Sequence, residues 1–200
     1  MRAAEIFVGR QPILDRRHNV VAYELLYRES AECLQAGVSD GAVATARLMD
    51  AAFRRVGIRT VLGPCRGFVN VDAETLMGRA IELLPRDQVV LELLETVAID
   101  DRVVGRCRQL KARGFRLALD DFCRYDERYE PLLEVADIVK IDILELDHEA
   151  LVDLVGRLKL YPARLLAEKV EDRQTALRCM KLGFDLFQGF LFGRPAVVGG

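Results

Sequence analysis

Short runs of apolar residues, each ending in one or two polar side chains, recur along most of this chain. The polar residues that end these runs are Asn70, Glu92, the neighbours Asp120 and Asp121, Lys140, Glu168 and Gln188. Short apolar runs between turn residues are typical of buried β-strands. The pattern therefore predicts a series of short strands, each with a polar group at its carboxyl end.

Segments with apolar residues at helical spacing lie between most of these runs. Helices are predicted at about residues 74–83, 100–114, 131–135, 151–158 and 173–182, and over Gly41 to Val56 with Gly57 as a stop, whereas residues 29–40 and 62–66 are expected to be loops. Strands that alternate with helices indicate a parallel sheet. No linker or repeat interrupts the pattern, so residues 1–200 are expected to form one domain.

The two ends of the chain depart from this alternation. Residues 5–28 contain two apolar segments joined by a charged turn at Asp15–Asn19, which predicts an antiparallel hairpin. The segment after Gly189 has no helical pattern that would cover the last seam of a barrel. The predicted fold is therefore α/β, a TIM-like (β/α) barrel with an antiparallel first strand, somewhat shortened.

In such a barrel the carboxyl ends of the strands meet at one rim, where active sites are found. The polar groups expected at this rim are Glu24, Asn70, Glu92, Asp120, Asp121, Lys140, Glu168, Glu171 and Gln188. Many carboxylates around one lysine favour hard divalent cations, Mg²⁺ or Mn²⁺. Two such ions ~4 Å apart, bridged by a carboxylate such as Asp120, suit in-line attack on a phosphodiester, with Lys140 and Glu168 handling the attacking water.

Each of these positions also has a purely structural interpretation. Asp120 and Asp121 fit a helix N-cap followed by a turn, and Glu92 fits a salt bridge with Lys140. Asn70 is a common turn residue, and Gln188 could simply begin a loop. Six strands that each end in a group of the right kind favour one shared site over six separate explanations.

Composition narrows the classes of function. The chain has 200 residues, 51% of them hydrophobic, a net charge of −2 and five cysteines without a Cys-x-x-Cys pair. The net charge argues against binding of a nucleic-acid polymer or a membrane surface. The number and spacing of the cysteines favour reduced thiols and argue against a zinc site. No signal-peptide core, membrane-spanning run, serine-hydrolase elbow or glycine-rich phosphate loop is present, so a cytoplasmic location is expected.

The same residues carry a resemblance to the EAL-domain family of cyclic di-GMP phosphodiesterases over nearly the whole chain. The matching segments are Gln11-Pro12-Ile13, Tyr23-Glu24-Leu25-Leu26-Tyr27-Arg28, Asn70, Glu92 with Glu95, Asp120-Asp121-Phe122, Val139-Lys140-Ile141-Asp142, Ala167-Glu168-Lys169-Val170-Glu171 and Gln188-Gly189-Phe190. The segments follow the order of the family's motifs, which makes the resemblance specific.

The resemblance implies a role for each matched residue. The metal ligands, for two Mg²⁺ or Mn²⁺ ions, would be Glu24, Asn70, Glu92, Asp120, Asp121 and Glu168. Lys140 and Glu168 would be catalytic. The residues that approach the nucleotide would be Gln11, Leu26, Arg28 and Gln188, and the loop after Asp121 would be supported by Glu95 and Glu171. The implied reaction opens cyclic di-GMP to linear pGpG.

Several positions depart from the family pattern. Leu25 replaces an alanine, Lys169 replaces a glycine, the segment between Arg28 and Asn70 is short, and Cys123–Glu127 replaces a small flexible loop that in the family links metal binding to dimerisation and catalysis. These departures resemble the subgroup in which a compact EAL domain precedes an HDOD domain. The expected partners are therefore cyclic di-GMP, an HDOD domain of a longer chain or another signalling protein, and a second copy in a homodimer.

Three functions stay open at this point. The complete set of ligand-type residues favours an active phosphodiesterase. The rewritten loop favours a degenerate module that binds cyclic di-GMP or a protein partner without turnover. The third function is that of an unrelated barrel enzyme with a carboxylate metal site, such as an enolisation catalyst that uses Lys140 as its base.

Overall fold

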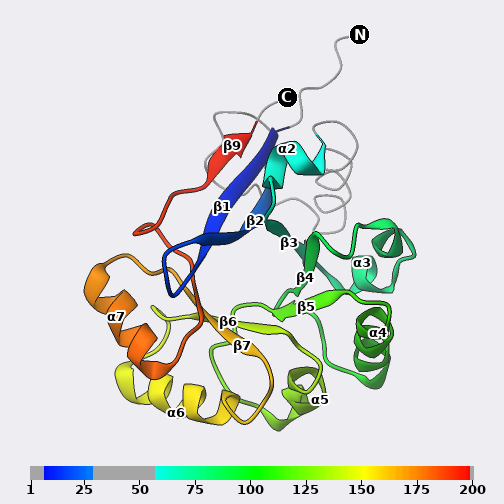
Figure 1. Cartoon of the computed structure of the whole chain (residues 1–200). Helices are drawn as coiled ribbons and strands as arrows, with labels where there is room; N and C mark the ends of the chain where they lie inside the picture. The colour runs from blue at the N-terminus through cyan, green and yellow to red at the C-terminus, as the bar shows by residue number, and fades with distance from the viewer. Residues whose placement is uncertain (1–6, 29–56, 199–200) are drawn as a thin grey trace.

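The structure is a computed structural model that describes residues 7–28 and 57–198. Its strands form a closed barrel (Figure 1) in the order β2-β3-β4-β5-β6-β7-β8-β1, because β1 also pairs with β2. The strands are β1 Phe7–Asp15, β2 Val20–Arg28, β3 Arg66–Val71, β4 Val89–Leu93, β5 Arg116–Leu119, β6 Ile138–Asp142, β7 Arg164–Glu168 and β8 Leu186–Phe187. The predicted α/β barrel is confirmed.

The opening hairpin also has the predicted form. Strand β1 runs antiparallel to β2 and to β8, whereas the neighbours from β2 to β8 are parallel. The turn between β1 and β2 is held by Asp15, whose Oδ1 accepts hydrogen bonds from the backbone N–H groups of Arg17 and Asn19. His18 in this turn has a left-handed backbone with φ of 63°.

Helices lie around the outside of the barrel (Figure 1). They are α2 Ile58–Leu62, α3 Ala73–Met77, α4 Asp101–Ala112, α5 Glu130–Leu133, α6 His148–Leu158 and α7 Arg173–Leu182. Aspartates cap the three long helices, since Asp100, Asp147 and Asp172 each accept a hydrogen bond from the backbone N–H three residues later. None of the described helices is long and apolar enough to cross a membrane.

Three elements differ from the sequence-based predictions. The helix expected over residues 74–83 is divided at Gly78 into α3 and a 3₁₀ turn at Ala80–Leu83, because Gly78 adopts an extended conformation. Helix α2 follows Gly57, where only a helix stop was expected. The tail forms a ninth strand, β9 Ala196–Val198, that pairs with β1. The helix predicted over residues 41–56 and the loop predicted over 29–40 lie outside the described residues.

The barrel interior is filled by one apolar side chain from each of its eight strands. These are Ile13, Ala22, Phe68, Val90, Ala118, Ile138, Leu166 and Leu186. A second, larger apolar cluster packs the outer face of the barrel against the helices. Because side chains on a strand alternate between its two faces, the next residue to point inward lies two positions further along. The inner apolar layer therefore determines which residues form the layer above it.

Candidate functional site

A polar layer lies directly above the apolar layer of the barrel. In β2 to β8 its members are found two positions after the apolar ones, and in the reversed strand β1 two positions before. This rule selects Gln11, Glu24, Asn70, Glu92, Asp120, Lys140, Glu168 and Gln188. The structure thus brings together eight of the residues proposed from the sequence, one from each strand or its carboxyl end.

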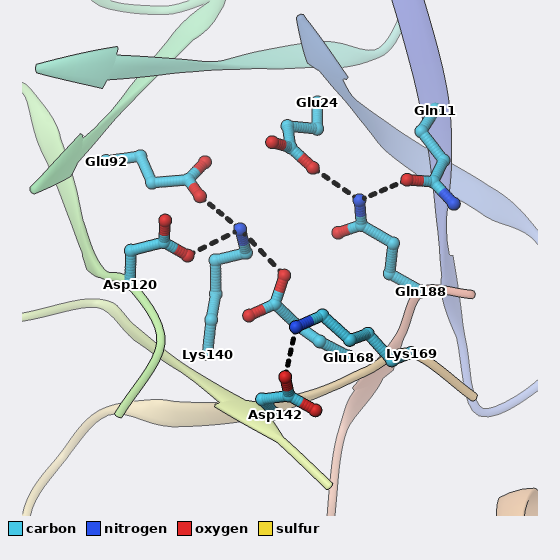
Figure 2. Close-up of polar contacts among 9 residues, drawn as sticks. All are labelled: Gln11, Glu24, Glu92, Asp120, Lys140, Asp142, Glu168, Lys169 and Gln188. Atoms are coloured by element: carbon cyan, nitrogen blue, oxygen red, sulfur yellow. Dashed lines mark hydrogen bonds and ion pairs between the residues drawn. The ribbon is translucent and has the colours of Figure 1, made fainter. Parts of the chain in front are cut away.

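Lys140 lies at the centre of this layer (Figure 2). Its ammonium group bonds to Glu92, lies 2.8 Å from Oδ1 of Asp120 and lies 2.9 Å from Oε1 of Glu168. Only 1% of the side chain is exposed. Burial alone would lower the pKa of Lys140, but the surrounding carboxylates hold that pKa well above its ordinary value. Lys140 is therefore a permanent positive charge, and the salt bridge between Glu92 and Lys140 exists as one part of a larger cluster.

The carboxylates around Lys140 differ in their affinity for protons. Burial raises the pKa of Glu92 well above its ordinary value, and the nearby Asp120 and Glu24 raise it further. Burial likewise raises the pKa of Glu168 to about 7. For Asp120, burial acts in the same direction, but Lys140 and hydrogen bonds hold its pKa below the ordinary value. One ammonium thus faces four carboxylates, and the layer carries an excess of negative charge that protons partly offset.

On the other side of the layer, Gln188 holds Glu24 and is itself bonded to Gln11. The Nε2 group of Gln188 donates to Glu24 and to Oε1 of Gln11, the latter over 3.0 Å (Figure 2). Gln11 donates in turn to the carbonyl of Gly193 at 3.1 Å. Gly189 has a φ of 153°, and a Cβ atom there would lie 2.2 Å from the carbonyl oxygen of Val170. A glycine at this position therefore lets the chain turn and keeps Gln188 in the layer.

An outer group of charged residues lies just beyond the strand ends. Asp121 follows Asp120 and has a left-handed backbone with φ of 43°. Lys169 follows Glu168 and also has a left-handed backbone, with φ of 55°. The Lys169 ammonium bonds to Oδ2 of the buried Asp142 (Figure 2). Burial, helped by the neighbouring Asp120, raises the pKa of Asp121. Carboxylate oxygens of Glu95, Asp120 and Asp121 lie within 4.8 Å of one another.

A cavity of about 390 Å³ opens over the polar layer. Its lining includes Gln11, Glu24, Leu26, Asp120, Asp121, Lys140, Glu168, Glu171 and Gln188, all proposed from the sequence. Leu144 and Phe190, which are exposed, form apolar walls with Leu26. The cavity therefore combines an acidic floor, which suits cations, with an apolar mouth, which suits an aromatic or other apolar group.

The roles proposed for Arg28, Glu95 and Glu171 have less structural support. The backbone of Arg28 ends β2, and its side chain lies outside the described part of the structure. Glu95 lines a neighbouring cavity beside Asp121. In the part of the chain that the structure describes, no hydrogen bond or ion pair joins Glu171 to residues 122–130, so its supporting role stays a prediction.

Sequence reasoning gave no role to Asp142 or to two of the apolar wall residues, Leu144 and Phe190. Asp142 lies two residues after Lys140 in β6, and the same alternation that selects the polar layer would have found it. Leu144 and Phe190 carried no such signal, because they belong to turns beyond the strand ends.

The polar layer has the chemistry of a site for a hard divalent cation. Buried oxygens with no hydrogen-bond partner in the described structure include Oε2 of Glu92, Oε2 of Glu168 and Oε1 of Gln188. Leaving such groups unpaired is costly unless a cation or water satisfies them. Carboxylate and amide oxygens are the ligands that Mg²⁺, Mn²⁺ and Ca²⁺ prefer. The residues present therefore fit one or more of these ions.

Comparison with known proteins identifies the family. The model of the EAL domain family matches residues 1–195 of this sequence. The chain belongs to the EAL domain family. An EAL protein of Bacillus subtilis, YkuI, solved in complex with its substrate cyclic di-GMP and calcium, shares the fold with a TM-score of 0.76 and 20% identity over 94% of this chain and 54% of its own. The resemblance expected from the motifs is thus confirmed.

Two curated relatives are also similar over almost the whole EAL domain. The protein YuxH of Bacillus subtilis, described as uncharacterized, is 38% identical over 98% of this chain and 48% of its own length. The cyclic di-GMP phosphodiesterase CdgJ of Vibrio cholerae is 35% identical over 96% of this chain and 45% of its own length. The chain thus spans about half the length of these curated relatives.

The loop after Asp121 of this EAL domain is held by contacts of Tyr125, which lies in the segment Cys123–Glu127 that departs from the family pattern, and of Phe122. The Tyr125 hydroxyl donates to Glu130 and lies 2.8 Å from the Tyr161 hydroxyl in the segment after α6. The ring of Phe122 packs edge-on against Tyr129 at 5.1 Å between centroids. The loop is therefore anchored within the chain itself, next to the aspartate that it has to position.

Proposed function

We propose that this EAL domain is a divalent-metal-dependent phosphodiesterase that opens cyclic di-GMP to linear pGpG. The observation that carries the proposal is the polar layer, in which all eight strands supply a group suited to metal binding, water activation or amide contact. No position of this layer is apolar. The names of the relative CdgJ and of the structure of YkuI support the same substrate.

The metal ions belong to this proposal. Mg²⁺ or Mn²⁺ would be held by Glu24, Asn70, Glu92, Asp120, Asp121 and Glu168. When bound, the ions supply Lewis acidity and lower the pKa of a coordinated water. The unpaired buried oxygens of Glu92 and Glu168 support the assignment, because they would be satisfied only when a cation or water is present.

Glu168 and Lys140 are the residues that we assign to the reacting water. Burial raises the pKa of Glu168 to about 7 in the metal-free layer, and a bound cation would lower that pKa, so Glu168 would be ionised and able to accept a proton when metal is present. Lys140 holds Glu168 in place through the ion pair of 2.9 Å and remains charged, so it can offset negative charge that develops on the phosphodiester. Glu168 would accept one proton of the water while the oxygen of the water bonds to phosphorus and the ester bond to the ribose oxygen breaks. The released ribose oxygen would take up a proton from solvent and become a hydroxyl.

Cyclic di-GMP would enter through the cavity above the polar layer. Gln11 and Gln188 offer amide groups at the floor, and Leu26, Leu144 and Phe190 offer apolar surface at the mouth. The cavity of about 390 Å³ holds part of such a ligand, and the rest would extend over the rim toward Arg28. The nucleotide contacts of Gln11, Leu26, Arg28 and Gln188 are part of the proposal.

A second function is favoured by the rewritten loop. If the contacts of Tyr125 place Asp121 differently from the geometry that turnover needs, the domain would bind cyclic di-GMP or a protein partner without hydrolysis. Three further statements also stay predictions. They are that residues 1–200 form a single EAL domain of a longer chain, that an HDOD domain or a second copy is the partner, and that the protein is cytoplasmic.

A hydrolysis assay separates the two functions. The purified protein is incubated with cyclic di-GMP and Mn²⁺ or Mg²⁺, and chromatography detects pGpG. We expect product from the parent protein and none from Glu24→Ala, whose circular dichroism should be unchanged. A folded parent protein that binds Mn²⁺ and yields no pGpG would favour the binding module instead.

A further inference from the structure

Lys169 stands at the mouth of the site in a backbone conformation that residues with a Cβ atom rarely adopt. Its φ is 55°, and the other described non-glycine residues with positive φ are His18 and Asp121. His18 lies in a hairpin turn, where such angles are common, whereas Asp121 and Lys169 both border the polar layer. Strained backbone that persists next to a cavity points to a side chain that has a task there.

The contacts of Lys169 explain why it is held in this conformation. Its ammonium bonds to Oδ2 of Asp142, whose side chain is 3% exposed, and Oδ1 of Asp142 accepts the backbone N–H of Leu144 at 2.9 Å. Asp142 and Glu168 are direct partners in the pairing of β6 with β7. The lysine therefore reaches from the end of β7 to the end of the neighbouring strand β6 and brings a cation to the outer side of the carboxylate layer.

The positive charge of Lys169 acts on the same carboxylates that would hold metal ions. The hydrogen bond to Asp142 raises the pKa of Lys169, and Asp121 and Glu168 raise it further. The same ammonium opposes the rise in the pKa of Asp121. About half of the Lys169 side chain is exposed, so its ammonium faces the cavity from which a metal ion would enter.

We propose that Lys169 serves as a built-in monovalent cation on the outer side of the site and weakens the binding of a second divalent ion there. The inference rests on the proposed metal site. The inner set, Glu24, Asn70, Glu92 and Asp120, then binds one ion tightly, and the outer set, Asp121 and Glu168, binds a second ion only weakly. The family resemblance assigns a glycine to this position, so the charge is a property of this chain.

The size of the effect follows from the charges. A unit positive charge within several ångströms of a divalent ion, in a partly exposed setting, opposes its binding by an amount that corresponds to roughly tenfold or more in affinity. The inner ion should be affected less, because the carboxylates of Glu92 and Asp120 bond to Lys140, whereas Lys169 bonds to Asp142 at the strand end (Figure 2).

The test is a titration of the metal-stripped 200-residue chain with Mn²⁺, followed by electron paramagnetic resonance of the free ion, which counts bound ions without any turnover. We expect one tightly bound Mn²⁺ in the parent protein and a second, much weaker one. Lys169→Met, which has a similar length but no charge, should bind the second ion at least tenfold more tightly, whereas Lys169→Arg should behave like the parent.

Lys111→Met is the matched control. Lys111 also pairs with a partly buried aspartate, Asp137, which likewise accepts a backbone N–H, from Leu117, but this pair lies outside the cavity lining. Its loss should leave both Mn²⁺ affinities unchanged. Should Lys169→Met fail to fold because Asp142 is left buried without its partner, the double variant Lys169→Met with Asp142→Asn removes both charges. Because Lys169 lines the cavity and Asp142 does not, this variant should bind the second ion more tightly than the parent, though by less than Lys169→Met.

The outcomes separate this inference from the proposed function. Two equally tight ions in the parent protein, or an unchanged second affinity in both Lys169→Met and the double variant, would overturn the role of Lys169 while the metal site stands. Loss of the tight ion in Glu24→Ala confirms the inner set. If neither the parent protein nor Lys169→Met binds Mn²⁺, the result would overturn both the role of Lys169 and the proposed metal site.

Discussion

Two lysines face the carboxylates of this EAL domain, and they differ in almost every physical respect. Lys140 is 1% exposed, lies in a regular strand and contacts three carboxylates. Lys169 is 52% exposed, has a left-handed backbone and bonds to one carboxylate. The first neutralises acids that the barrel interior cannot otherwise hold, and the second adds a charge at a position where water also reaches.

This contrast divides the site into an inner part that supports the fold and an outer part that can vary. A charge removed from the inner part leaves buried acids without a partner, which typically costs about 3–5 kcal/mol. Removal of the half-exposed Lys169 leaves one buried acid, Asp142, without its ion-pair partner, compared with the three acids around Lys140. We therefore expect inner substitutions to affect folding and metal binding together, and outer substitutions to affect mainly the second metal ion.

Lys140→Met should give the largest effect. Without metal, the variant should lose about 3–5 kcal/mol in its free energy of unfolding, measured with urea, because Glu92, Asp120 and Glu168 remain buried without a cation. Saturating Mn²⁺ should restore part of this loss. Lys111→Met, at a half-exposed ion pair, should lose less than about 1 kcal/mol. Equal stabilities of the two variants would show that the inner lysine is not needed to hold the acids.

The dependence of stability on pH sharpens the description of the inner part. The pKa of Glu168 is raised from 4.5 to about 7, so the folded protein keeps a proton that the unfolded chain releases. The free energy of unfolding of metal-free protein should therefore fall as the pH rises from 4.5 to about 7. Saturating Mn²⁺ should oppose this fall, because metal ligands must be deprotonated.

The measurement is urea unfolding at several pH values across that window. Glu168→Gln provides the control, because the difference in free energy of unfolding between this variant and the parent isolates the contribution of the Glu168 carboxyl group. If this difference in free energy of unfolding were constant from pH 4.5 to about 7, the pKa of Glu168 would not be raised by folding. The assignment of Glu168 as a base near neutral pH would then lose its support.

The smallest effect concerns the backbone of Lys169. Neither variant can form the ion pair with Asp142, but glycine tolerates a φ of 55°, whereas methionine keeps the backbone strain. Lys169→Gly should therefore be more stable than Lys169→Met by about 1 kcal/mol in urea unfolding. A methionine variant at least as stable as the glycine variant would show that the left-handed turn relaxes when the bond to Asp142 is lost.

The alternation of side chains made the fold and most of the site predictable from the sequence. Each apolar run placed one residue inside the barrel, and the polar residue two positions later necessarily faced the same way, as with Phe68 and Asn70 or Leu166 and Glu168. Since parallel strands end at one rim, convergence of these groups followed from the order of the strands.

Contacts that depend on long-range geometry could not be predicted in this way. The bond between Lys169 and Asp142 requires the left-handed turn after β7 and the pairing of β6 with β7. The contact between the hydroxyls of Tyr125 and Tyr161 joins residues 36 positions apart. The sequence held no alternating pattern that could predict β9 or its pairing with β1, because a strand of three residues is too short to show one.

The central claim is that the inner polar layer activates a water molecule against cyclic di-GMP. The most direct measurement is a single-turnover reaction in water enriched in oxygen-18, with Mn²⁺ present and mass spectrometry of the product. We predict pGpG that carries one oxygen-18 atom in its terminal phosphate, and no product after chelation of the metal. Folded protein with Mn²⁺ bound that forms no pGpG would contradict the account and leave a domain that binds without turnover.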